Sequence, residues 1–297
     1  MDMTRQTAAI ATAIVFATGA FWGLYWLPVR NLGELGLNGA WGTVAISGAA
    51  LVLLASRAVA HATAIRQAGR AALISIALGG AAFALYSVAF LYGRVAIVIL
   101  LYFLTPVWST LIARHVMGWP TPPIRLIAIG TGIVGLLVML GADGTAPIPR
   151  NLGEWMGLAA GFLWSVATTG IRAKARIAPP EAAFVFAGGA FLTACALAPW
   201  LAPPPTAVAL PDIAHIVGLS ALTGGLWWAV SVAALMWATV RLEPARVGLL
   251  LMSEVILGAL SAAWLAGEHL SGAEIAGGVL VLMAGLLEIR PIPRPRR

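Results

Sequence analysis

The residue with the clearest chemical potential is Glu254, the only acidic side chain well inside a long apolar stretch of this sequence. A carboxylate in hydrocarbon costs several kcal/mol unless it is neutral, paired or open to a water-filled cavity. Such a group can hold the ammonium of a substrate or carry a proton. The alternative is a protonated glutamate bonded to the backbone or to a neighbouring serine, and the sequence leaves both interpretations open.

Large aromatic residues share these apolar stretches, and the chain has 12 tryptophans. Aromatic walls stack on flat or apolar ligands, and the faces of the rings attract cations. For any single ring, simple packing between helices is the alternative. The rings that fall deep within apolar stretches and that we expect to line a cavity are Trp22, Tyr25, Tyr86, Tyr102, Trp164 and Trp228.

Hydroxyl groups accompany these rings. Ser87 follows Tyr86, and Ser165 and Thr169, four residues apart beside Trp164, fall on one helical face. We expect Ser87, Ser165 and Thr169 to reach the same cavity. The competing interpretation is that each hydroxyl bonds a backbone carbonyl one turn back, as Ser and Thr in helices often do.

Two prolines are predicted hinges. Pro28 lies near the end of the first apolar stretch and Pro106 in the middle of the fourth. Because proline lacks a backbone N–H donor, it interrupts helical hydrogen bonding. Bending is therefore expected at both positions.

Other chemistries have no support in the sequence. The four histidines do not share ligand spacing, so no metal and no cofactor is expected. Neither a phosphate-binding loop nor a nucleophile elbow is present. An enzyme would need a cluster of polar catalytic residues at one depth, and a channel would need rings of polar residues along one route. Neither pattern can be assembled.

Composition places the chain in a lipid bilayer. Its residues are 61% hydrophobic and 10% charged, whereas soluble domains average about 45–50% apolar and about 25% charged. The net charge of +7 does not indicate nucleic acid, because no basic stripe is interleaved with aromatics. The single cysteine, Cys195, excludes a disulfide framework.

We predict an all-α integral membrane protein, because a spanning helix needs about 20 mostly apolar residues and ten stretches qualify. Tryptophans near their ends, such as Trp155, Trp200 and Trp264, are expected in the aromatic belts of the membrane interfaces. The predicted spans are 8–28, 38–56, 71–92, 95–113, 124–142, 153–171, 182–200, 213–238, 245–265 and 271–289.

The distribution of basic residues predicts that both termini lie in the cytoplasm. With this orientation, 15 of the 18 basic residues fall in inside segments, as the positive-inside rule requires. Only Arg30, Arg94 and Arg150 fall outside.

The chain also repeats itself. Gly19–Trp22 corresponds to Gly161–Trp164, 142 positions later, and the same offset pairs Arg30 with Arg172. Trp22 and Trp164 are therefore predicted at equivalent depths. This pairing favours cavity lining over packing for these two rings.

The predicted halves are residues 1–148 and 149–297. Near their ends, residues 113–118 correspond to 262–267 at an offset of 149. Because each half has an odd number of spans, five, the second half must enter from the opposite side, and the repeat is inverted. In such a chain we expect a transporter, with the substrate site where the halves meet.

Three motifs in this order resemble the drug/metabolite transporter superfamily of the EamA type over nearly the whole chain. They are Gly-Ala-Phe-Trp-Gly at 19–23 with Pro28, Tyr-Phe-Leu-Thr-Pro-Val-Trp at 102–108, and Gly-Glu-His-Leu-Ser at 267–271. Within the superfamily the chain is most similar to the bacterial YddG-like aromatic amino-acid exporters. Two departures stand out: Gly118-Trp119-Pro120 replaces a frequent Gly-Glu-Arg, and Val255 replaces a common proline after Glu254.

This resemblance implies export of aromatic and other apolar amino acids across the bacterial inner membrane by alternating access. The alternative within transport is a broad exporter of lipophilic or cationic drugs or metabolites, since an aromatic box with one carboxylate suits cations. The expected partners are a small-molecule substrate and the lipid bilayer. We expect a monomer, with a dimer as the alternative, and the energy source stays open between proton antiport and passive exchange.

Overall fold

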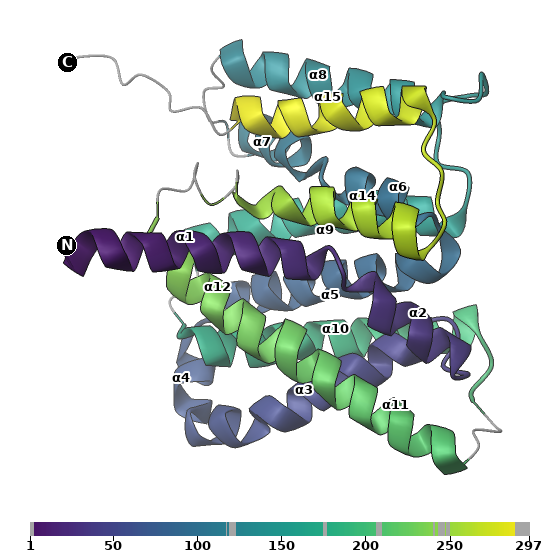
Figure 1. Ribbon diagram of the computed structural model, residues 1–297. Coiled ribbons are helices and arrows are strands. Elements are labelled where there is room, and N and C mark those ends of the chain that lie inside the picture. The colour runs from purple at the N-terminus through teal and green to yellow at the C-terminus, as the bar shows by residue number, and fades with distance from the viewer. Residues whose placement is uncertain are drawn as a thin grey trace, which may run out of the picture.

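A computed structural model describes residues 3–116, 118, 123–174, 177–205, 210–239, 241–242, 247 and 250–288. These residues form a bundle of helices and contain no β-strand, which confirms the all-α prediction for this part of the chain. The bundle has two ends (Figure 1). At the termini end, α1 begins and α15 ends; at the Arg30 end, α2 ends and α15 begins.

The helices of the first half follow the predicted spans closely. α4 lies between predicted spans two and three. These helices are α1 (Met3–Trp22), α2 (Trp26–Glu34), α3 (Trp41–Ala60), α4 (Ala62–Gln67), α5 (Arg70–Tyr92), α6 (Val95–Tyr102), α7 (Thr105–His115) and α8 (Pro123–Leu140).

The second half contains a long helix, α9, and a π-helical segment, η1, between α11 and α12. Ala245, the predicted start of span nine, lies outside the described residues. The helices are α9 (Leu152–Lys174), α10 (Pro179–Leu201), α11 (Leu210–Thr223), η1 (Gly224–Ser231), α12 (Val232–Thr239), α14 (Ser253–Leu265) and α15 (Gly272–Glu288).

Six helical segments among the described residues are long and apolar enough to cross a membrane, which indicates a multi-pass membrane protein. They coincide with predicted spans one, two, three, four, seven and eight. The other four predicted spans fall on α8, α9, α14 and α15. Large apolar side chains such as Trp200 and Trp264 are exposed on the outside of the bundle, as expected for tryptophans at the membrane interfaces.

Two helical runs among the described residues are interrupted midway, and a third helix begins directly after a turn. α1 and α2 are separated at Gly23–Tyr25, α6 and α7 at Phe103–Leu104, and a turn at Met252 precedes α14. Pro28 and Pro106 lie in the first turn of the helix that follows a break, where no backbone donor is needed. The break at Met252 forms without a proline.

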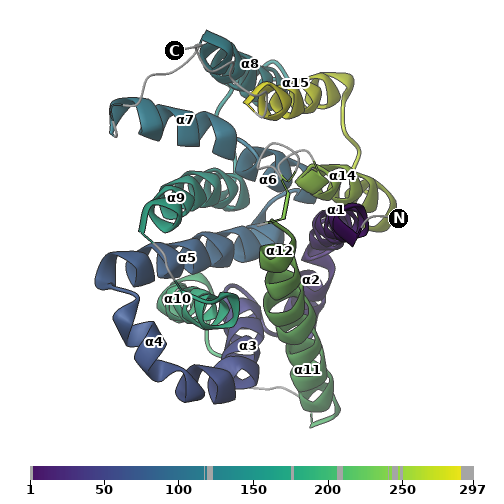
Figure 2. The same ribbon diagram turned by 90° about the vertical axis from the view of Figure 1, so that its left-hand side faces the viewer.

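Close helix packing depends on glycine at a few contacts. A Cβ on Gly80 of α5 would lie 2.7 Å from the amide nitrogen of Ala190 in α10. In the pair formed by α8 and α15, Gly135 and Gly277 each touch the backbone of the other. Figure 2 shows α8 beside α15, and α10 between α5 and α3.

Candidate functional site

The central cavity lies between the two halves of the sequence and has a volume of about 450 Å³. This volume is within the range of small-molecule sites, about 300–1,000 Å³. The lining starts in the middle of the bundle and runs towards the termini end, where Ile171, Ile177 and Leu235 lie. The other lining residues are Trp22, Ile76, Phe83, Tyr102, Phe103, Thr105, Pro106, Trp164, Ala182, Phe186, Val232, Leu251, Met252, Glu254 and Gly285.

Phe83 is the centre of the aromatic wall. Its ring meets those of Trp22, Trp164 and Phe186 edge-on, with centroids 4.9, 5.2 and 5.3 Å away. Tyr102 contacts the same ring at 5.9 Å. Edge-to-face packing leaves ring faces and edges available to contact a flat apolar ligand. The rings come from α1, α5, α6, α9 and α10, so both halves contribute to the wall.

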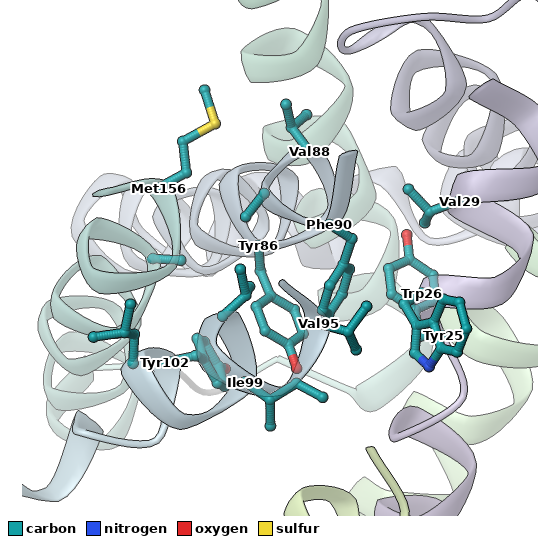
Figure 3. Packing of buried hydrophobic residues seen from close by; sticks show 14 of the residues in the cluster. Tyr25, Trp26, Val29, Tyr86, Val88, Phe90, Val95, Ile99, Tyr102 and Met156 are labelled. Carbon is teal, nitrogen blue, oxygen red and sulfur yellow. The ribbon is translucent and has the colours of Figure 1, made fainter. Parts of the chain in front are cut away.

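Glu254 supplies the carboxyl group of the cavity. It lies in the first turn of α14, directly after the break at Met252, where the helix dipole favours an anion. Its Oε1 accepts a hydrogen bond from the hydroxyl of Tyr86 at 3.0 Å. Figure 3 shows Tyr86 next to Tyr102, and their ring centroids are 4.5 Å apart. Among the described residues that line the cavity, Glu254 is the only one with an acidic or basic side chain of the Asp, Glu, Lys or Arg type.

Five of the residues singled out in the sequence line this cavity. They are Trp22, Tyr102, Trp164, Glu254 and the predicted hinge Pro106. Because Trp22 is on α1 and Trp164 is on α9, the two repeat-related indoles come from different halves of the chain.

Three other predicted cavity residues lie together in a separate, fully buried cluster. The hydroxyl of Ser87 is 3.1 Å from that of Tyr25 and 2.8 Å from that of Thr43. Trp228 donates its Nε1–H to the Tyr25 hydroxyl at 3.2 Å. We call Tyr25, Thr43, Ser87 and Trp228 the hydroxyl cluster. It ties the break after α1 to α3, α5 and η1 and is not part of the cavity lining.

The hydroxyls of Ser165 and Thr169 are engaged by the backbone. Ser165 donates to the carbonyl of Gly161 at 2.8 Å and lies 3.0 Å from that of Thr105, at the start of α7. Thr169 donates to the carbonyl of Ser165 at 2.8 Å. These are the backbone contacts that the competing interpretation describes. Pro28 lies in α2, away from the cavity lining.

Sequence reasoning missed Phe83 and Phe186. Phenylalanine in an apolar stretch carries no contrast with its neighbours, so neither residue stands out in the sequence. One available signal is spacing, because Phe83 precedes Tyr86 by three residues and therefore shares its helical face.

The Arg30 end of the bundle is held by ion pairs. Glu268, after α14, accepts hydrogen bonds from the backbone amides of Val95 and Ala96 at 2.7 and 3.1 Å. The Nη2 of Arg30 lies 3.3 Å from the same carboxylate. Arg94 pairs with Glu274 at the start of α15. Arg94 and Glu274 also border a smaller polar pocket of about 270 Å³. The described residues contain no cluster of potential metal ligands.

No family model and no curated protein matches the chain. A solved structure described only as "Crystal structure of protein" has a TM-score of 0.55 and 20% sequence identity with it. The match covers 93% of this chain and 94% of that chain. The two chains therefore share a fold over nearly their whole lengths.

Proposed function

We propose that the chain is a secondary carrier of the drug/metabolite transporter superfamily, of the EamA type, in the bacterial inner membrane. It exports aromatic and other apolar amino acids by alternating access, and its ten spans form two inverted five-helix halves. The observation that carries this proposal is the aromatic cavity between the halves, with Glu254 as its one described charge.

Contacts between equivalent positions support the inverted repeat. Gly19 of α1 packs against the backbone of Leu251, just before α14. Its counterpart Gly161 of α9 packs against the backbone of Tyr102, at the end of α6. Tyr102 and Leu251 are 149 positions apart, the offset at which the ends of the halves correspond. Exchanging the two halves by a two-fold rotation would therefore turn the Gly19–Leu251 contact into the Gly161–Tyr102 contact.

A second pair of contacts has the same relation. Gly80 of α5 packs against the carbonyl of Phe186 in α10, and Gly224 of η1 packs against the carbonyl of Ile46 in α3. The offsets of 144 and 140 positions are close to those of the sequence repeat. The partners have also exchanged halves, as a two-fold axis between the halves requires.

The direction of the cavity favours export. Its described lining extends towards the termini end, which the charge distribution assigns to the cytoplasm. The three basic residues assigned to the outside, Arg30, Arg94 and Arg150, all lie at the opposite end, where each is paired with an acidic side chain. In this state the carrier receives substrate from the cytoplasm.

The substrate follows from the chemistry of the lining. The edges of Phe83, Trp164 and Phe186 accommodate an aromatic or apolar side chain, and the Glu254 carboxylate accepts an ammonium group. A second candidate, export of lipophilic cations, is favoured by one observation. The described lining has a carboxylate but no basic group to receive the carboxylate of an amino acid.

Uptake into proteoliposomes tests the proposal. Labelled phenylalanine, tryptophan, threonine and methyl viologen are offered to the purified chain, with and without a pH step. We expect phenylalanine and tryptophan to enter faster than threonine, and more slowly into liposomes with Glu254→Gln. Methyl viologen uptake without amino-acid uptake would replace the leading proposal with the second. If the pH step changes nothing, obligatory proton coupling is excluded.

A further inference from the structure

Glu268 connects three separate parts of the chain at the Arg30 end. Its two carboxylate oxygens accept the amides of Val95 and Ala96, which begin α6. Arg30 of α2 reaches the same carboxylate while its guanidinium also donates to the carbonyls of Phe90 and Gly93, where α5 ends. The segment after α14 is thereby joined to α2 and to the α5–α6 hairpin. These bonds are charge-assisted and hence stronger than neutral ones.

A second connection lies beside the first. Arg94 pairs with Glu274 and donates to the carbonyl of His269 at 2.5 Å. Glu274 is itself fixed at the start of α15, because its carboxylate accepts the amide of Ser271 at 2.7 Å. We call Arg30, Arg94, Glu268 and Glu274 the outer lock. Its members come from both halves of the sequence, so separating the halves at this end must break it.

The sequence does not repeat Glu268 at the termini end. The offset of 142 gives Arg172 as the counterpart of Arg30, and the offset of 149 gives Trp119 as the counterpart of Glu268. Trp119 and the side chain of Arg172 lie outside the described residues. Trp119 cannot replace Glu268, because tryptophan has no carboxylate to accept hydrogen bonds from an arginine or from two backbone amides.

The structure assigns to Glu268 the role of holding the Arg30 end closed, so that the carrier rests with its cavity open to the cytoplasm. This role rests on the proposed alternating access. Each transport cycle must break the bonds of Glu268 before substrate leaves.

Accessibility of one cavity cysteine tests this role without measuring transport. In a Cys195→Ser background, Thr105→Cys places a thiol in the cavity lining. A membrane-impermeant maleimide is applied to intact cells, where it reaches the thiol only through the Arg30 end, and to inside-out vesicles, where it enters through the termini end. We expect Glu268→Gln to raise labelling in intact cells by roughly tenfold, as loss of charge-assisted bonds shifts a two-state equilibrium.

Glu154→Gln is the matched control. Glu154 is a buried carboxylate at the same end, but its partners Arg150 and Asn151 are its own neighbours in the chain. This variant is expected to leave labelling of intact cells unchanged. Arg30→Gln is the second lock variant, and it leaves the amide bonds of Glu268 in place.

The possible outcomes distinguish failure of the outer lock from failure of the proposed transport function. If inside-out vesicles label but neither Glu268→Gln nor Arg30→Gln raises labelling of intact cells, the lock is overturned and the carrier stands. An equal rise in Glu154→Gln also overturns the lock. If the Thr105→Cys thiol is labelled from neither side, the cavity itself is not accessible, and the proposed function fails.

Discussion

Glu254 and Glu268 are two nearly buried carboxylates in different regions of the same bundle, with exposed fractions of 8% for Glu254 and 9% for the side chain of Glu268. Glu268 at the Arg30 end has two backbone amides and the guanidinium of Arg30 as partners. Glu254 in the cavity has one described partner, the hydroxyl of Tyr86.

The difference indicates two uses of one residue type. A carboxylate offers about four acceptor positions, and burial is costly unless they are filled. At Glu268 the described residues fill three of them, so the group stabilises the contact between halves. At Glu254 the described residues fill one, and under the proposed function water or the ammonium of a substrate would complete the rest. Position in the fold, rather than burial, separates the binding carboxylate from the closing one.

The largest expected effect is the loss of transport on removing the charge of Glu254. Glu254→Gln should lower the initial rate of phenylalanine uptake at least about tenfold, because a charge-assisted bond to the substrate is lost. Glu268→Gln should retain substrate affinity within about twofold, since Glu268 does not line the cavity. Equilibrium binding and uptake kinetics in the same liposomes measure both effects. Similar losses of substrate affinity in the two variants would contradict the assignment of substrate binding to Glu254 and not to Glu268.

For the free energy of unfolding we expect the opposite order, with a larger loss in Glu268→Gln than in Glu254→Gln. Glu268→Gln is expected to lower the free energy of unfolding by about 1.5–3 kcal/mol, the contribution of hydrogen bonds to a charged group. Glu254→Gln should cost less, because an amide keeps the bond from Tyr86 and no longer has to be buried as an ion. Midpoints of thermal unfolding in one detergent compare the two. A lower midpoint for Glu254→Gln than for Glu268→Gln contradicts the roles assigned to them.

A smaller effect is expected from the aromatic wall. Trp164→Ala should weaken phenylalanine binding by about two- to tenfold, since an aromatic pair adds about 0.5–1.5 kcal/mol beyond burial. Trp155→Ala is the matched control, because Trp155 is on the same helix, α9, but lies on the outside of the bundle. Both affinities are measured with labelled phenylalanine in detergent. Equal weakening by the two substitutions would show that Trp164 does not contact the substrate.

Residue type and depth in the sequence identified part of the site. Glu254, Trp22 and Trp164 stood out because a charge or an indole contrasts with an apolar stretch, and the structure places all three on one cavity. Tyr25 and Ser87 have similar depth and chemistry but belong to the hydroxyl cluster. Depth along a span does not specify which face of the helix turns inwards, so the sequence could not separate the two groups.

Helix geometry was predictable only where a residue imposes it. Pro106 lies in the first turn after the break between α6 and α7, where proline does not interrupt a helical hydrogen bond, and its role as a hinge stays a prediction. The break at Met252 has no such residue and could not be predicted, although it places Glu254 at a helix start. The π-helical segment η1 was likewise unmarked, and it brings Trp228 to the Tyr25 hydroxyl.

The most direct test of the central claim is the position of a bound substrate. Crystals of the chain grown with 4-bromophenylalanine would locate the ligand by the anomalous signal of bromine. We predict a bromine peak in the central cavity among Phe83, Trp164 and Phe186, with the amino group of the ligand beside Glu254. A peak confined to the polar pocket near Arg94, or a cavity that stays empty at saturating ligand, would contradict the account.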